Sequence, residues 1–208
     1  MVKRGESFAV VALSLLFVFI FISACSSNNK INNKINSEIN TEVKQSAPQA
    51  EAKVQLIDTN ADLKKFAIDA KDLPGFRVVS ETAIERNLQN PSAPTRYLIS
   101  FDNKLGNNFN STQYKSIFNE IFLYHNVSSL NKGFSKEIML KSMPSTYNES
   151  TAYTLGDESY IFSGKLFGTD MGSIWFRKHN VLVKLSFVGI EAKDAASYAK
   201  ITESRINN

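Results

Sequence analysis

The chain contains few of the residues that build disulfides, zinc sites and thiol nucleophiles. Its 208 residues include one cysteine and two histidines. A lone cysteine has no partner for an intramolecular disulfide and cannot supply the thiolates of a structural zinc site. His125 and His179 fall at an expected strand end and an expected turn, where a solvated side chain is the simplest interpretation. We therefore expect no metal and no cofactor, and a core stabilised by apolar packing alone.

The chain also lacks a strong charge of either sign. It has 24 Lys and Arg against 20 Asp and Glu, which gives a formal net charge of +4. The basic residues are scattered, which argues against nucleic acid as a partner. A mild positive balance is compatible with a position near anionic lipid headgroups.

The one long apolar run, residues 8–22, follows Lys3 and Arg4 and precedes the small residues before Cys25. This is the layout of a secretory signal. At about 15 residues the run is shorter than the roughly 20 needed to span a bilayer, although an uncleaved anchor is the alternative. The sequence Ile22-Ser23-Ala24-Cys25 resembles the lipobox of prokaryotic lipoproteins. The resemblance implies removal of residues 1–24 and a diacylglycerol on the Cys25 thiol, which would anchor the chain to the outer face of the cytoplasmic membrane or to the outer membrane.

Residues 25–52 are expected to tether a globular domain, residues 53–208, to that lipid. They are rich in Asn, Ser, Lys, Glu and Gln and contain no aromatic residue, a composition typical of disorder. Isoleucines recur every four residues at Ile31, Ile35 and Ile39, so a short interaction helix is the alternative.

Hydrophobic periodicity in the globular part predicts an α+β fold. We expect a single, mostly antiparallel sheet of about six strands flanked by three helices, in the order α-β-β-β-α-β-β-β-α. The expected helices cover residues 61–70, 128–142 and 192–206, and the expected strands cover residues 76–84, 96–101, 116–125, 158–163, 173–178 and 181–188. His179-Asn180 is expected to form the two-residue turn of a hairpin.

Four short segments carry a further resemblance: Asp72–Phe76, Leu155–Ser159, Phe176–Val181 and Ser204–Ile206. Together with the element order, they resemble PsbP/Mog1-like domains and the extracytoplasmic sensor domain of a mycobacterial serine/threonine kinase. The resemblance implies a helix-flanked antiparallel sheet with a ligand-sized cleft. The chain departs from the kinase sensor domain, which is disulfide-bonded.

Three groups of residues are candidate sites. Leu166 and Phe167 lie between two glycines, as in an exposed apolar loop that binds a partner, and Trp175 is either a core residue or a surface-binding aromatic. Asp157 and Glu158 form an acidic pair, but neighbouring strand residues point to opposite faces, so a structural turn is the simpler interpretation. The sequons at Asn110, Asn126 and Asn148 are candidate glycosylation sites, if the host glycosylates exported proteins.

The remaining motifs fail on spacing or partners. Ser129 to Lys132 matches S-x-x-K without the K-T-G or S-D-N partners of penicillin-binding enzymes. The segment Asp102 to Asn108 lacks the ligand spacing of a calcium loop. The sequence therefore predicts a non-enzymatic, lipid-anchored domain that binds a small ligand or an envelope protein. The alternatives are an assembly accessory of the cell envelope and a small envelope hydrolase.

Overall fold

The computed structural model of the chain describes residues 56–85, 93–103 and 113–207. Seven strands form one sheet in the order β1-β2-β3-β7-β6-β5-β4, and every neighbouring pair is antiparallel. The strands are β1 (Phe76–Ile84), β2 (Thr95–Asn103), β3 (Ser116–Leu123), β4 (Asn148–Ser150), β5 (Glu158–Leu166), β6 (Thr169–Lys178) and β7 (Val181–Val188). The helices are η2 (Leu63–Lys65), α2 (Val127–Gly133), α3 (Lys136–Ser142) and α4 (Ala192–Ile206).

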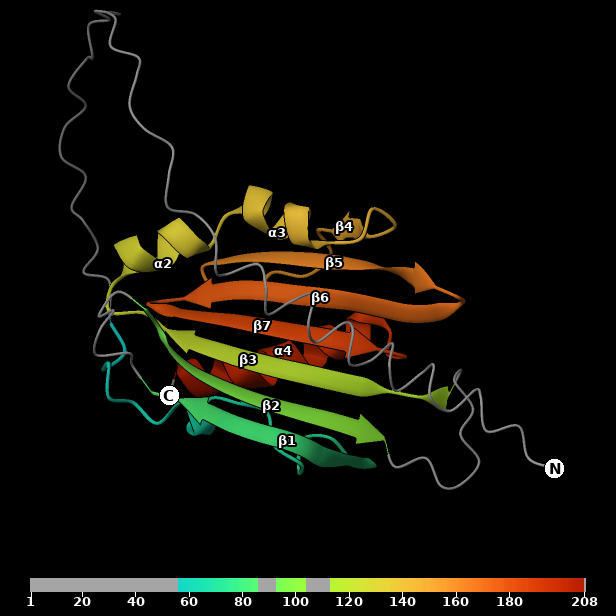
Figure 1. The fold of residues 1–208 in the computed structure, drawn as a ribbon, viewed down its shortest axis with the longest axis horizontal. Coiled ribbons are helices and arrows are strands. Elements are labelled where there is room, and N and C mark those ends of the chain that lie inside the picture. Colours follow the sequence, from blue (N-terminus) through green and yellow to red (C-terminus); the bar gives the residue numbers. More distant parts are fainter. Residues whose placement is uncertain (1–55, 86–92, 104–112, 208) are drawn as a thin grey trace, which may run out of the picture. The chain divides into compact units, whose positions relative to one another are not determined.

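The fold is thus an α+β fold with a single antiparallel sheet, as the sequence predicts. The expected number of six strands is wrong, because β4 adds a seventh strand at the edge beyond β5. The sheet consists of two meanders, β1-β2-β3 and β4-β5-β6-β7, which meet where β3 pairs with β7. Between them, α2 and α3 carry the chain from the centre of the sheet to the far edge (Figure 1).

Two of the three expected helices differ in the structure. Residues 61–70 form only a 3-10 turn, in which Asp62 accepts a hydrogen bond from the Lys64 N–H. The expected helix over 128–142 is divided into α2 and α3, because the Ser135 side chain accepts a hydrogen bond from the Ile138 N–H and starts a new helix. The cap of α2 is Asn126, whose side chain accepts from the Ser129 N–H. The third helix, α4, has the bounds that the sequence predicts.

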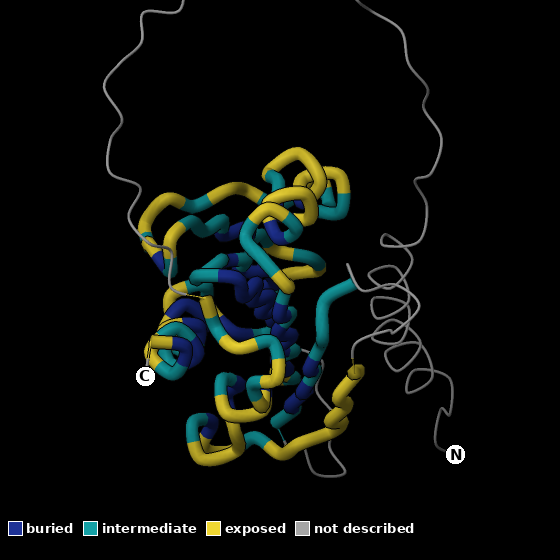
Figure 2. The backbone as a smooth tube through the Cα atoms, turned by 90° about the vertical axis from the view of Figure 1, so that its left-hand side faces the viewer, coloured by how far each residue is buried: buried dark blue, intermediate teal, exposed yellow. Residues whose placement is uncertain are grey.

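The main core lies between one face of the sheet and the layer formed by α4 and the segment around η2 (Figure 2). Odd-numbered residues of β3 and β7 face this core. All are apolar except Asn119, which is fully buried and accepts a hydrogen bond from the Ile68 N–H. Among the apolar ones, Ile121 and Val183 are fully buried. Arg205 connects α4 to the segment that follows η2, because its guanidinium donates hydrogen bonds to the Ala67 carbonyl and to Asp72.

A second, smaller cluster lies on the opposite face, where α2 and α3 cover part of the meander β5-β6-β7. It contains the buried residues Leu130, Phe134, Met139, Phe162 and Leu182. Among the described helices, α2 and α3 are the ones that pack on this face. Phe122 of β3 and Trp175 of β6 pack against this cluster and adjoin the charged residues described next.

Candidate functional site

The face of the sheet opposite α4, here called the charged face, carries buried charged residues among aromatic and aliphatic ones. Cross-strand register aligns Leu98 of β2, Glu120 of β3, Lys184 of β7 and Trp175 of β6 in one row. The adjacent row begins with Arg96, directly opposite Phe122. Directly paired residues project from the same face, so side chains from four strands converge here.

Glu120 is the centre of this group. One carboxylate oxygen accepts a hydrogen bond from the Arg96 guanidinium, and the other lies 3.2 Å from the Lys184 ammonium nitrogen. We call these residues, with Phe122 and Trp175, the Glu120 cluster. The three charged residues sum to one positive charge at neutral pH.

Both cations of the Glu120 cluster also lie over aromatic rings. The Arg96 guanidinium carbon is 5.3 Å from the centre of the Phe122 ring, and the Lys184 nitrogen is 4.8 Å from the centre of the Trp175 ring. Cation–π contacts at this range contribute about 0.5–2 kcal/mol, more when water is excluded. The aromatic rings thus hold the two cations in place on either side of the carboxylate.

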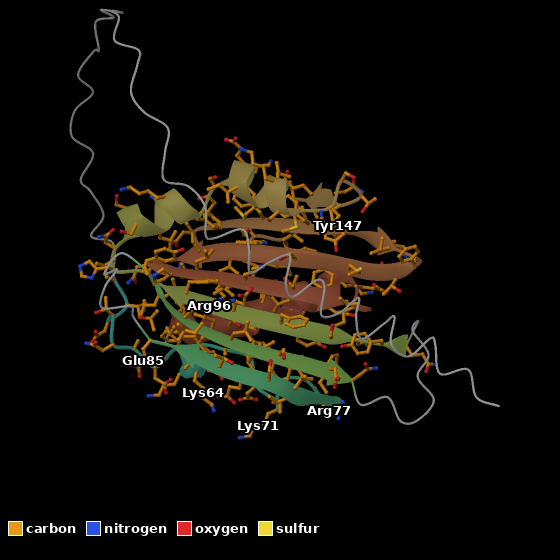
Figure 3. The ribbon with its side chains drawn as sticks, in the orientation of Figure 1. Lys64, Lys71, Arg77, Glu85, Arg96 and Tyr147 are labelled. Carbon is orange, nitrogen blue, oxygen red and sulfur yellow. The ribbon has the colours of Figure 1, made fainter. Side chains whose placement is uncertain are left out.

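The burial of these charges is unusual for a sheet of this kind. Glu120 is 8% exposed and Lys184 is 6% exposed, whereas the Arg96 side chain retains 27% of its surface. Lys and Glu are almost never fully buried unless they are paired, because a lone buried charge loses several kcal/mol of hydration. Arg96 is therefore the charged member of the cluster that solvent reaches most easily; in Figure 3 it lies on the sheet, away from Arg77 at the β1 edge and Tyr147 near β5.

Two buried nitrogen atoms on the charged face have no hydrogen-bond partner among the described residues. They are Nε of Arg96 and Nε1 of Trp175. Both atoms only donate hydrogen bonds. A buried donor without an acceptor lowers the stability of the folded state by about 1–3 kcal/mol. The folded domain therefore carries this penalty at two donors of the positively charged Glu120 cluster.

The predicted apolar loop is the tip of the β5–β6 hairpin. Phe167 is 88% exposed there, and Phe167 and Gly168 both have positive φ, at 50° and 79°. Leu166 ends β5 and is partly buried. Trp175 lies elsewhere, opposite Tyr160 in the middle of the hairpin, so the structure does not bring the three predicted residues together.

Asp157 and Glu158 diverge, as expected for neighbours at the start of a strand. Asp157 accepts hydrogen bonds from the Lys178 ammonium and the His179 N–H, at 3.0 Å and 2.9 Å. Burial acts to raise the pKa of Asp157, but these two bonds outweigh it and leave the pKa below its ordinary value. The Asp157 carboxylate therefore stabilises the β6–β7 turn through these two hydrogen bonds.

Glu158 points to the charged face, at its β5 edge. Its oxygens accept hydrogen bonds from the Tyr160 hydroxyl at 2.6 Å and the Arg177 Nε at 2.8 Å. The Tyr160 hydroxyl, with the nearby Arg177, lowers the pKa of Glu158. Arg177 also donates to Asn131 of α2, so this pair connects the helix to the sheet.

The candidate glycosylation residues occupy different settings. Asn126 caps α2 through its side chain, whereas Asn148 is exposed at the start of β4. Asn110 lies outside the described residues, as do Ile22, Ser23, Ala24 and Cys25 of the predicted signal and lipidation site.

The described residues contain neither a membrane-spanning helix nor a cluster of metal-ligating side chains. Within residues 56–85, 93–103 and 113–207, no helix is long and apolar enough to cross a membrane. No group of three or more His, Cys, Asp or Glu side chains in the same ranges is arranged to hold a metal ion.

The Glu120 cluster was missed at the level of sequence because each of its charged residues, taken alone, resembles a solvated strand position. The available signal was a charged residue within each of two largely apolar strands, with Glu120 between Phe118 and Phe122 on one face of β3 and Lys184 between Val183 and Leu185 in β7. Only the pairing of the two strands shows that these residues face each other.

Comparison with known proteins identifies a weakly similar solved structure. No protein-family model matches the chain, and no curated protein resembles it significantly. Among solved structures, the extracellular domain of PknH from Mycobacterium tuberculosis aligns with 74% of this chain and 100% of its own, at a TM-score of 0.46 and 9% identity. A likeness this weak transfers neither fold nor function, so function is inferred from the side chains of the domain itself.

Proposed function

We propose that the chain is an exported, lipid-anchored, non-enzymatic domain that binds a ligand on the charged face of its sheet. The observation that carries the proposal is the Glu120 cluster, in which Arg96, Glu120 and Lys184 converge beside Trp175. Binding sites characteristically combine aromatic walls with a few placed polar groups, and this cluster has both.

The chemistry of the cluster favours binding over a purely structural role. Replacing a buried ion network with well-packed apolar residues is often neutral or stabilising by about 1–4 kcal/mol. The core face of the same strands is packed in that way, with Ile121 and Val183 fully buried. A buried charged network is therefore poorly explained by stability alone, and ligand binding accounts for its presence.

Thermal unfolding of the full chain in detergent tests ligand binding. In a panel of charged and neutral small molecules, a ligand at 100 times its dissociation constant stabilises the folded state by about 2.7 kcal/mol. We expect Lys184→Met to abolish the response and Lys141→Met, at an exposed position on α3, to retain it. A ligand that stabilises all three proteins equally would bind elsewhere and would contradict the proposed site.

Anchoring through Cys25 is a separate part of the proposal and has its own test. Cys25→Ser is expected to abolish metabolic labelling by a fatty-acid probe and to cause an unprocessed precursor to accumulate. Unchanged labelling of the variant would rule out this lipidation site.

A second candidate function, binding of another envelope protein, is favoured by the free edge of β1. This edge strand has nine residues and is exposed along nearly all of its length, including Val79 and Ile84. Long exposed edges pair with extended segments of other chains, although a bulge between Val78 and Ser80 disrupts this one. A photo-reactive residue at Ile84 should crosslink to another protein on intact cells, and the same residue at Lys141 should not; equal crosslinking at both positions would exclude the edge.

A further inference from the structure

We infer that the ligand of the charged face is an anion, a molecule that presents a carboxylate or phosphate group to Arg96. The inference rests on the proposed function and narrows it to one chemical class. It is drawn from the balance of donors and acceptors in the Glu120 cluster.

The first step is that the unmet groups of the cluster are donors. Arg96 Nε and Trp175 Nε1 are buried without a partner, and neither can accept a hydrogen bond. A ligand that satisfies them must supply acceptor oxygens. Carboxylates and phosphates are acceptors at every oxygen when ionised, and hydrogen bonds to charged groups are about twice as strong as neutral ones.

The second step is that the one acidic residue of the cluster is already engaged. The two oxygens of Glu120 face Arg96 and Lys184 respectively. A cationic ligand would have to compete with both cations for this carboxylate. The single excess positive charge of the cluster opposes a cation and favours an anion.

The third step is the orientation of Arg96. Its side chain comes from the second residue of β2, lies over the Phe122 ring and uses one terminal nitrogen for Glu120. The contact with Phe122 and the hydrogen bond to Glu120 restrain the guanidinium, whose remaining donors, including Nε, share its plane. A planar guanidinium edge matches the geometry of a carboxylate or phosphate through two parallel hydrogen bonds, which a lysine ammonium cannot reproduce.

Trp175 provides the measurement, because it is the only tryptophan in the chain. Its fluorescence therefore reports on the cluster without labelling. The full chain in detergent is titrated with inorganic phosphate, with succinate, and with succinamide as the uncharged counterpart of succinate. Short-chain phosphatidylglycerol and phosphatidylcholine then distinguish a lipid headgroup from a free anion as the source of the charge.

We expect phosphate, succinate or phosphatidylglycerol to change the fluorescence saturably, with at least a ten-fold preference for succinate over succinamide if a carboxylate is the ligand group. A preference for phosphatidylglycerol over phosphatidylcholine without a response to free phosphate or succinate identifies a lipid source. Arg96→Lys keeps the positive charge but loses the planar donor pair, and it should weaken binding at least ten-fold. Arg77→Lys is the matched control, since Arg77 is an exposed arginine paired with Asp102 at the β1 edge, and it should bind as the unaltered chain does.

The unaltered chain alone can overturn the inference, so the test does not depend on the folding of Arg96→Lys. Equal affinity for succinamide and succinate with no preference for phosphate or phosphatidylglycerol would overturn it, as would the absence of any response to the anions. If the chain responds instead to a neutral or cationic compound from the thermal-unfolding panel, the anion inference is wrong while the proposed binding function stands.

Discussion

The substitution Glu120→Gln is the sharpest test of the Glu120 cluster as a buried charge network. It removes the only carboxylate of the cluster and leaves the Arg96 and Lys184 cations close together. The Lys184 side chain is 7% exposed and the Arg96 side chain is 27% exposed, so Lys184 carries most of the penalty. Removing one partner of a buried ion pair costs about 3–5 kcal/mol, and the partial exposure of Arg96 places the expected loss near 3 kcal/mol.

A double-mutant cycle separates the pair from its surroundings. Glu120→Gln, Lys184→Met and the double variant are unfolded with urea and followed by circular dichroism, because Trp175 itself contacts Lys184. A loss of about 3 kcal/mol corresponds to a fall of about 6–12 °C in the melting temperature of a domain of this size. We expect a coupling energy of at least about 1.5 kcal/mol between Glu120 and Lys184.

The control cycle uses Glu137 and Lys141, an ion pair on α3 whose side chains are 79% and 74% exposed. Its coupling should be about 0.5 kcal/mol or less, since water screens exposed pairs. If Glu120→Gln costs no more than disruption of this surface pair, the cluster is solvated, and the argument from buried charge to a binding site fails.

Three further predictions concern the β6–β7 turn and its supports. Asn180→Ala should lower the free energy of unfolding, measured with urea, by about 3 kcal/mol, because the buried Asn180 amide makes three hydrogen bonds to backbone groups of Ile57 and Tyr124. A loss below about 1 kcal/mol would mean that water replaces these bonds in the variant. Gly156→Ala should lower the free energy of unfolding by more than about 2 kcal/mol, because the added Cβ would lie 2.2 Å from the Arg177 carbonyl oxygen and the residue has a φ of 58°. Gly168→Ala is the control: this position also has a positive φ but has open space around it, so the loss should be only about 1 kcal/mol. Asp157→Asn should lower the melting temperature at pH 7. The difference in melting temperature between the variant and the unaltered chain should disappear as the pH falls below about 4. The pKa of Asp157 is lower in the folded state, so its stabilisation is present above the ordinary value of 3.8 and is lost as the carboxylate becomes protonated. A gap that persists at pH 2 would contradict the assignment.

Strand periodicity was a reliable guide to the fold because the core face is mostly apolar, with Asn119 as the buried polar residue of β3 on that face. Alternation in β3 and β7 locates both strands, since every second residue faces α4 or η2. The strand β4 escaped prediction because its three residues, Asn-Glu-Ser, bury almost no apolar surface and are fixed by pairing with β5. Pairing of this kind depends on tertiary context, which local propensity does not contain.

The helices were harder to predict because local capping competes with periodicity. An apolar stripe at Leu63, Phe66 and Ala67 suggested a helix, but only one turn forms, and the Ile68 N–H donates to the Asn119 side chain instead of continuing it. In the second case, a serine within the apolar pattern began a new helix rather than continuing the old one. The candidate site was less predictable still, since it exists only through the register of four strands.

The buried amide of Asn180 would have a mechanical consequence under the proposed N-terminal anchoring. Ile57, near the start of the described domain, is bound through both its N–H and its carbonyl to this one side chain at the β6–β7 turn. A pull from the N-terminal side would reach the sheet at that point and would load these hydrogen bonds before those of the central strands. The exposed Phe167 is at the opposite end of β6, because the two turns flank that strand. Under tension the hairpin tip would therefore lie at the end of β6 that is away from the attachment.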